Sequence, residues 1–183
     1  MYPSALVLII FSSCVYRSIL KTFTVNINLN LYNILGGYMN TLQIWDPPML
    51  NKWDHPLIQE RFFPDRWKML VCCLMLNLTS HKQVNPVIDG FFERWPDAQR
   101  AANADEKIMK EYLRSLGMYN KRSKTIIKMS KQFLEGFCQA KDLYGCGKYA
   151  SDSDMIFYQG RWREVEPTDG ALKRYIDFLQ KIV

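Results

Sequence analysis

A strongly apolar stretch is the feature of this sequence that most constrains its fold. In DRWKMLVCCLMLNL, residues 65–78, the apolar side chains recur three and four positions apart: Trp67, Leu70, Val71, Leu74, Met75 and Leu78. This spacing places them on one face of an α-helix, and Asp65 stands where an N-cap residue is expected. We therefore predict a buried helix that neighbouring elements must cover.

Helix signals continue on both sides of this stretch. His55 and Pro56 predict the start of a short helix in which Ile58 and Phe62 share a face, and Pro64 ends it. Two capping-box patterns, 80–83 and 103–106, precede two further helices. The first of these helices carries a regular apolar face: Val84, Val87, Ile88, Phe91 and Phe92.

The second half of the chain is also helical in pattern. Gly117 is predicted as a left-handed C-terminal cap, and a helix over 121–135 is predicted to end at Gly136. Another helix is expected near Tyr149, and a last one after Thr168 with an inward face: Leu172, Tyr175, Ile176 and Leu179. Apart from TVNINLNL, residues 24–31, the sequence contains no convincing strand pattern. The predicted fold is an all-α, two-lobed orthogonal helical bundle.

The first forty residues differ from the rest. SALVLIIFSSCVY is apolar but short of the roughly 20 residues that a membrane span needs. A weak targeting peptide, an appendage and an over-extended start with Met39 as the internal start are the alternatives. We predict an N-terminal extension over 1–40 and a domain over 41–183, with one lobe from about 41–64 plus 137–183 and the other from 65–136.

Charge and cysteine content narrow the classes of function. With 24 Lys and Arg against 18 Asp and Glu, the net charge of +6 favours an anionic partner. The five cysteines are odd in number, and Cys72 and Cys73 are adjacent in an apolar run, which indicates buried thiols in a reducing compartment. Without a C-x-x-C pair, and with only His55 and His81 as histidines, no metal site is predicted.

A glycine turn, LYGCGKYASDS at 143–153, is the candidate functional motif. A nucleotide-binding Walker loop would follow a strand and carry Ser or Thr after the lysine, whereas Tyr149 follows Lys148 here. The pair Gly145 and Gly147 between two short helices exposes successive backbone N–H groups, which suit a DNA phosphate. An ordinary helix cap is the alternative interpretation.

The motif resembles the helix-hairpin-helix element of the DNA glycosylase superfamily, in which a catalytic aspartate follows the hairpin. Asp169 stands 22 residues after Gly147. A more specific resemblance, over 45–179, is to the glycosylase domain of methyl-CpG-binding-domain thymine glycosylases. It rests on the stretches WDPPMLNKWDHPLIQERFFPDRWKMLVCCLMLNLTS, LRSLGMYNKRSKTIIKMS and VEPTDGALKRYIDFL. The methyl-CpG-binding domain itself is absent from this sequence, and 1–40 lies outside the resemblance.

The resemblance implies a mechanism and an interlobe active-site cleft. Such enzymes flip the target nucleotide out of the duplex, and a carboxylate stabilises the positive charge that develops on the sugar. Asp169 matches that carboxylate; its alternative role is a simple N-cap. Tyr149 stands where lyase-competent relatives carry a lysine, and a phenol cannot form an imine, so a monofunctional enzyme is implied. Gln59 matches a base-reading pocket glutamine, beside Ile58; alone, Gln59 would suit a solvated helix face.

The resemblance also implies DNA contacts. Met118 falls in a loop whose apolar tip wedges beside the orphaned base, although a helix-end residue folded into the core is the alternative. Leu78 and Ala171 are departures, because the family carries arginine and lysine there. Leu78 can serve as an apolar wedge or continue the helix stripe. The predicted hairpin contacts are Gly145, Gly147, Lys148 and Ser151. A run of basic residues follows the wedge loop, and in it Lys121, Arg122 and Lys124 are predicted to contact phosphates. A solvated helix face is the alternative interpretation of this run.

The sequence therefore predicts a monofunctional mismatch DNA glycosylase of base excision repair that removes thymine or uracil opposite guanine. Double-stranded DNA is the expected partner, with a monomeric, nuclear protein, no membrane association and no dissociable cofactor. A monovalent cation at the hairpin carbonyls is compatible with the resemblance. A catalytically weak or inactive DNA-binding module, suggested by Leu78, and a helical interaction protein are the competing hypotheses.

Overall fold

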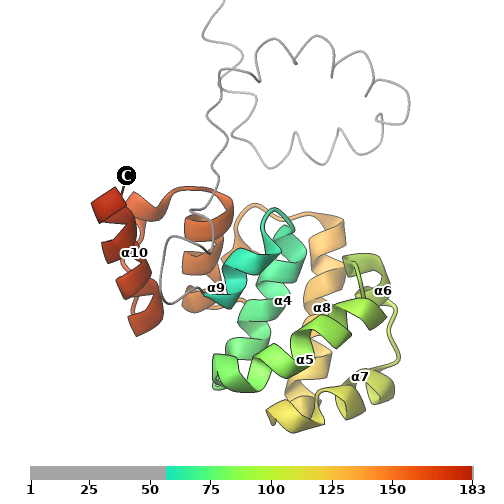
Figure 1. Ribbon diagram of the computed structural model, residues 1–183. Helices are drawn as coiled ribbons and strands as arrows, with labels where there is room; N and C mark the ends of the chain where they lie inside the picture. Colours follow the sequence, from blue (N-terminus) through green and yellow to red (C-terminus); the bar gives the residue numbers. More distant parts are fainter. Residues whose placement is uncertain (1–56, 183) are drawn as a thin grey trace, which may run out of the picture. The chain divides into compact units, whose positions relative to one another are not determined.

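The computed structural model describes residues 57–182, and this part of the chain is built from helices (Figure 1). The α-helices are α4 (Arg66–Leu76), α5 (His81–Arg94), α6 (Ala98–Ala102), α7 (Glu106–Tyr112), α8 (Tyr119–Glu135), α9 (Lys148–Ser153) and α10 (Gly170–Ile182). The 3₁₀ turns are η2 (Ile58–Phe62), η3 (Arg114–Leu116), η4 (Ala140–Asp142) and η6 (Trp162–Glu164), and η5 (Asp154–Tyr158) is a π-helix. The predicted all-α class is confirmed.

The predicted N-terminal extension, the TVNINLNL strand pattern and the helix start at 55–56 lie outside the described residues. Within 57–182, no helix is long and apolar enough to cross a membrane. In the same range, no group of three or more metal-binding side chains comes together. Three cysteines there, Cys72, Cys73 and Cys146, are buried free thiols.

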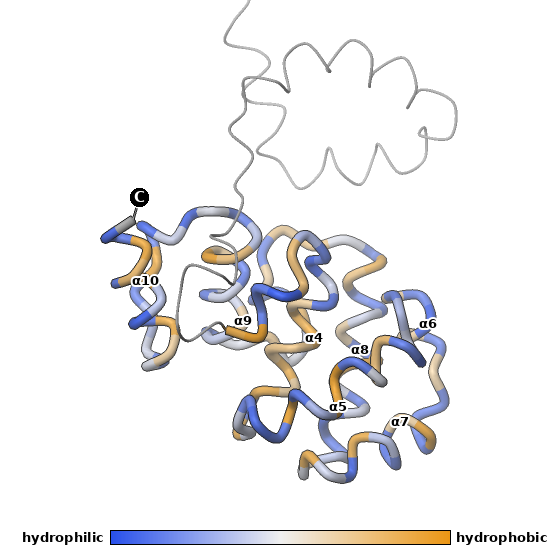
Figure 2. The backbone as a smooth tube through the Cα atoms, in the orientation of Figure 1, coloured by the Kyte–Doolittle hydropathy of each residue, from blue (hydrophilic) through white to orange (hydrophobic). Residues whose placement is uncertain are grey.

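The helix α4 occupies the middle of the described fold, as predicted from its apolar face (Figures 1 and 2). Asp65 caps it by accepting a hydrogen bond from the Lys68 backbone N–H at 3.0 Å. The expected face is buried: Trp67, Leu70, Val71, Leu74 and Met75. Leu78 does not continue this face, because α4 ends at Leu76 and the chain turns away before it.

The larger hydrophobic core surrounds α4. The elements η2, α5, α8 and α9 contact α4, and α6 and α7 pack on α8. Aromatic rings fill the region between α5 and α7: the Phe91 ring lies 4.8 Å from Trp95 and 6.1 Å from Tyr112, centroid to centroid. The predicted face of α5 is buried except for half-buried Val87.

Local side-chain hydrogen bonds set the helix starts, and one differs from the prediction. Gln83 accepts from the Ser80 backbone N–H at 3.2 Å, as the capping-box pattern predicts. The pattern at 103–106 does not form. Asp105 caps α7 by accepting from Lys107 N, and the Asn103 side chain instead donates to the Gln99 carbonyl of α6. The carboxylate nearer the helix start satisfies the free N–H groups, so Asn103 is left to close the preceding helix.

Two elements, α6 and the π-helix η5, were not anticipated. Asp97 caps α6 by accepting from Arg100 N at 2.8 Å, and its alanines pack on α8. Five residues are too few for a periodic signal, which explains why the sequence does not reveal α6. The π-helix continues α9 without a break, and one extra residue in its turn changes which side chains face inward.

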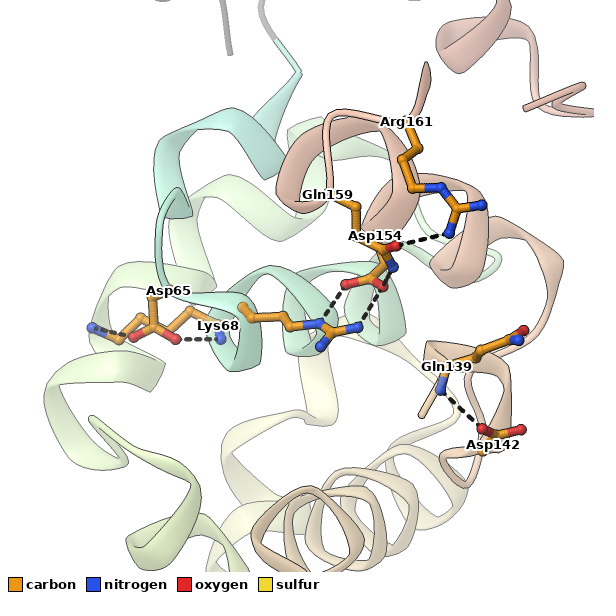
Figure 3. Close-up of polar contacts among 8 residues, drawn as sticks. Asp65, Lys68, Gln139, Asp142, Asp154, Gln159 and Arg161 are labelled. Carbon is orange, nitrogen blue, oxygen red and sulfur yellow. Dashed lines mark hydrogen bonds and ion pairs between the residues drawn. The ribbon is translucent and has the colours of Figure 1, made fainter. Parts of the chain in front are cut away.

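A buried ion pair stabilises the start of η5 (Figure 3). The Arg66 guanidinium donates two hydrogen bonds of 2.7 Å to the buried Asp154 carboxylate. The guanidinium also lies against the rings of Phe137 and Tyr158. Gln159 donates a third hydrogen bond to the same carboxylate at 2.6 Å. These contacts fix η5 against the N-terminal end of α4.

A second hydrophobic core lies at the C-terminal end of the chain. Its buried members are Ile156, Phe157, Trp162, Val165, Leu172, Tyr175, Ile176 and Leu179. The inward face predicted for α10 is thus confirmed, and the Phe157 and Tyr175 rings lie 4.8 Å apart. Tyr149 packs partly against both cores. The division into lobes at 64–65 and 136–137 stays a prediction.

Candidate functional site

The glycine hairpin connects η4 to α9. The Cys146 backbone N–H donates to the Leu143 carbonyl at 3.1 Å and closes the turn. Gly145 has a φ of 84°, and a Cβ at this position would lie 2.2 Å from Thr125 Cγ2. A side chain is therefore excluded there by both conformation and space. Around Gly147, the N-cap of α9, the space is open, so another molecule can approach its backbone closely.

A cavity of about 1030 Å³ opens beside this hairpin. Its walls come from η2, α4, the hairpin and the start of α10. The lining includes the predicted residues Ile58, Gln59, Leu78, Gly145, Gly147, Lys148, Tyr149 and Asp169. The candidate catalytic and pocket residues, which are far apart in the sequence, are thus brought together in one cavity.

Gln59 and Tyr149 form a direct pair in this cavity. Gln59 is 1% exposed, and its Nε2 donates to the Tyr149 hydroxyl at 2.5 Å. Burial raises the pKa of Tyr149, and the negative charge of Asp169 raises it further. The phenol therefore stays neutral at physiological pH. The Gln59 amide retains a carbonyl oxygen and one N–H, a donor and acceptor pair that suits the edge of a pyrimidine.

Asp169 is both an N-cap and a cavity residue, so its capping role does not remove it from the candidate site. Its Oδ1 accepts hydrogen bonds of 2.9 Å from the backbone N–H groups of Ala171 and Leu172. These bonds hold the carboxylate at the start of α10, beside the positive end of the helix dipole. The side chain is half-buried and lines the cavity. A fixed negative charge is thus presented to any ligand there.

Two apolar tips stand at exposed turns. Leu78, at the cavity wall, is 84% exposed with a φ of 56°, and Met118 is 41% exposed with a φ of 48°. Leucine rarely adopts a left-handed conformation, and holding it there costs on the order of 1 kcal/mol. Met118 borders a second, smaller cavity of about 110 Å³. Exposure excludes the interpretation of Leu78 as part of the helix stripe and that of Met118 as a core residue.

Arg122 requires a correction. It is 5% exposed and contacts the Thr79 hydroxyl together with five backbone carbonyl oxygens, those of Leu74, Met75, Asn77, Leu116 and Gly117. The guanidinium thereby satisfies carbonyl groups at the C-terminal end of α4 and in the loop before α8. Its donors are occupied inside the protein, which removes Arg122 from the predicted phosphate contacts.

The other predicted DNA contacts differ in their availability. Lys121 and Lys124 are exposed on α8, although Lys124 Nζ lies 3.9 Å from a Glu106 carboxylate oxygen. Lys148 forms an ion pair of 2.9 Å with Asp152. The hydroxyl of Ser151 is buried, with no hydrogen-bond partner among the described residues. Burial removes this hydroxyl from the surface where a DNA contact was predicted.

Sequence reasoning missed two ionisable residues near the cavity. Arg174, one turn into α10, lines its wall. Glu60, next to Gln59 in η2, is buried and faces the Tyr175 side chain of α10. Burial raises the pKa of Glu60 to about 7, and hydrogen bonding from Tyr175 and the Leu57 backbone offsets only part of the rise. The apolar pattern of η2 gives no signal for a buried carboxyl.

Glu60 makes the stability of the protein dependent on pH. Below about pH 4.5 the carboxyl is protonated in both states; between pH 4.5 and 7 only the unfolded chain ionises, so stability falls as pH rises. We expect Glu60→Gln, which removes this ionisation, to match the wild type near pH 4.5 and to exceed it by up to about 3 kcal/mol above pH 7. Urea unfolding at several pH values measures the difference, and a difference independent of pH would contradict the assignment.

A glycine hairpin between short helices, beside a cavity with an aspartate at a helix start, defines a helix-hairpin-helix protein. The family described as "HhH-GPD superfamily base excision DNA repair protein" matches residues 71–182, more than half of the chain. The chain belongs to this family of base excision DNA repair proteins.

Individual relatives agree with this assignment. The chain is 37% identical over 136 residues to the methyl-CpG-binding domain protein 4-like protein of Arabidopsis thaliana, covering 71% of this chain and 31% of the relative. It is 29% identical over 100 residues to the thymine-DNA glycosylase of Aeropyrum pernix (50% and 45% covered). It is 30% identical over 105 residues to the thymine/uracil-DNA glycosylase of Pyrobaculum aerophilum (53% and 46% covered). The chain thus spans less than half the length of each of these relatives.

Proposed function

We propose that this protein is a monofunctional DNA glycosylase that removes thymine or uracil opposite guanine. The observation that carries the proposal is the single cavity that holds Gln59, Tyr149 and Asp169 beside the glycine hairpin. The names of the relatives, thymine and thymine/uracil glycosylases among them, support a pyrimidine base as the target. A nuclear, monomeric protein acting on double-stranded DNA belongs to the same proposal.

The cavity residues supply the chemistry that base removal requires. A base inside a duplex is out of reach, so the nucleotide must flip out at a cost of a few kcal/mol, and a mispaired base costs less. Gln59 would bind the pyrimidine edge. As the N-glycosidic bond breaks, its electron pair leaves with the base and positive charge develops on the sugar. The Asp169 carboxylate stabilises that charge, and a water molecule adds to the sugar while its proton passes to the departing base anion.

The exposed tips and the hairpin would hold the DNA in position. Leu78 and Met118 are the candidate wedges at the gap that the flipped nucleotide leaves. The N–H groups at Gly147 and the lysines Lys121 and Lys124 are the candidate phosphate contacts. A monovalent cation at the hairpin carbonyls remains part of the proposal. The compact turn with its left-handed Gly145 is compatible with such a site.

Base-release assays test the proposed function. Duplexes with a labelled G·T mismatch, a G·U mismatch or full pairing are incubated with the protein, and abasic sites are then cleaved with alkali. Cleavage of the G·T or G·U strand alone supports a mismatch glycosylase. Binding without cleavage would favour a DNA-binding module, and neither binding nor cleavage would favour a helical interaction protein.

Tyr149 predicts that the strand stays uncut. A phenol cannot form an imine with the sugar, and the family resemblance places Tyr149 where a lyase carries a lysine. Lys148, which also lines the cavity, is in an ion pair with Asp152. We expect no strand cleavage before alkali and no covalent complex after borohydride reduction on G·T or G·U duplexes. A borohydride-trapped complex would contradict the monofunctional assignment. A lyase-competent enzyme of the same superfamily serves as the positive control.

A further inference from the structure

Arg174 is a cationic side chain in the candidate active site whose role is unassigned. It lines the cavity of about 1030 Å³ together with Thr168, Asp169 and Ala171 from the same end of α10. Arg174 and Ala171 are three positions apart, and therefore share one face of the helix. Ala171 contributes no charge to this wall, so Arg174 supplies its positive charge.

The Arg174 guanidinium is available for a ligand. Lys148, the other lysine or arginine on the described cavity wall, forms an ion pair with Asp152 at 2.9 Å. Arg174 has no ion pair or hydrogen bond with any of residues 57–182, and its side chain is exposed. A charge that the fold does not use, at the edge of a cavity, is free to bind an anion.

The guanidinium lies close to the start of α10. A Cβ at Gly170 would lie 3.6 Å from an Arg174 terminal nitrogen, so the side chain folds back over the residue that follows Asp169. This places a cation within one helical turn of the cavity carboxylate. The Asp169 carboxylate directs its Oδ1 to two backbone N–H groups of the same turn, so Arg174 remains unpaired.

We propose that Arg174 binds a backbone phosphate next to the flipped nucleotide. A nucleotide that enters the cavity brings its flanking phosphates toward the Asp169 carboxylate, and the like charges repel each other. A guanidinium between them offsets this repulsion and can hold two phosphate oxygens at once. The neutral base would instead contact Gln59 and Tyr149. The inference rests on the proposed function only in that the cavity takes a nucleotide of duplex DNA.

Binding measurements without catalysis test this role. The probe is a duplex with a tetrahydrofuran abasic-site analogue opposite guanine, which cannot be processed. Arg174→Gln should weaken binding about tenfold and reduce the slope of log Kd against log salt by about one, the value for one lost phosphate contact. Arg174→Lys should recover part of the affinity. Lys173→Gln is the matched control, because Lys173 is exposed on α10 and does not line the cavity.

Neutral phosphates identify the contact directly. Methylphosphonates are placed one at a time on the strand that carries the analogue. At one position beside the analogue, the methylphosphonate should weaken DNA binding by the wild type about tenfold and leave binding by Arg174→Gln unchanged. Equal losses of binding affinity for Arg174→Gln and Lys173→Gln would overturn the proposal, as would the absence of any such methylphosphonate position. If thymine or uracil is excised but no methylphosphonate effect depends on Arg174, only the Arg174 proposal fails. If such an effect is found but no base is excised, only the proposed glycosylase function fails. No binding by the wild type would overturn both.

Discussion

Asp169→Asn should abolish base excision without weakening duplex binding. Asparagine keeps the side-chain oxygen that accepts from the N–H groups of Ala171 and Leu172, so the start of α10 should stay in place. It loses the negative charge that stabilises the sugar in the transition state. Single-turnover excision on a G·U or G·T duplex should fall by about 10³-fold or more, equivalent to about 4 kcal/mol.

The control for this variant is Asp177→Asn, which removes an exposed carboxylate from the same helix away from the cavity. It should keep excision within about twofold of the wild type, an effect below 0.5 kcal/mol. A Kd of Asp169→Asn for an abasic-analogue duplex no higher than that of the wild type would show that the loss lies in catalysis. Retained excision by Asp169→Asn would remove this residue from the mechanism.

Arg122→Met should strongly destabilise the protein. Methionine fills part of the volume of the buried side chain but donates no hydrogen bond to the carbonyl oxygens at the end of α4 and in the loop before α8. Buried acceptors left without donors cost about 1–3 kcal/mol each, and partial access of water reduces the sum. We expect the free energy of unfolding to fall by about 3–5 kcal/mol, measured by urea denaturation followed by circular dichroism.

Lys121→Met is the matched control, because this neighbouring cation is exposed on the same helix. It should change the free energy of unfolding by less than about 0.5 kcal/mol. A destabilisation of Arg122→Met no larger than that of Lys121→Met would show that the network of carbonyl contacts contributes little to stability.

The sequence predicted the helices because their signals are local. The apolar face of α4 and that of α10 repeat at the helical period, and capping residues such as Asp65 act within one turn. The prediction was wrong where two nearby residues can cap the same helix. At 103–106, Asp105 caps α7 in place of Asn103. It also missed the five-residue α6, whose formation depends on packing against α8.

The site could be predicted only through the family resemblance, because its parts come from distant segments. Gln59 and Tyr149 are paired through space at 2.5 Å across 90 positions, and no periodicity reveals such a pair. Arg122 was assigned to DNA because it stands in a run of lysines. Its partners are backbone carbonyls, which every residue has, so composition cannot show that a fold directs five of them to one point.

The Arg122 contacts also determine when the entropy of arranging the two exposed tips, Leu78 and Met118, is lost. The guanidinium bonds to Asn77, the residue before Leu78, and to Gly117, the residue before Met118. Both tips are thereby tied to one rigid group, and their separation is set during folding. Preorganisation of this kind lowers the cost of association. In the proposed function, the DNA duplex rather than the protein would then change shape when the two meet.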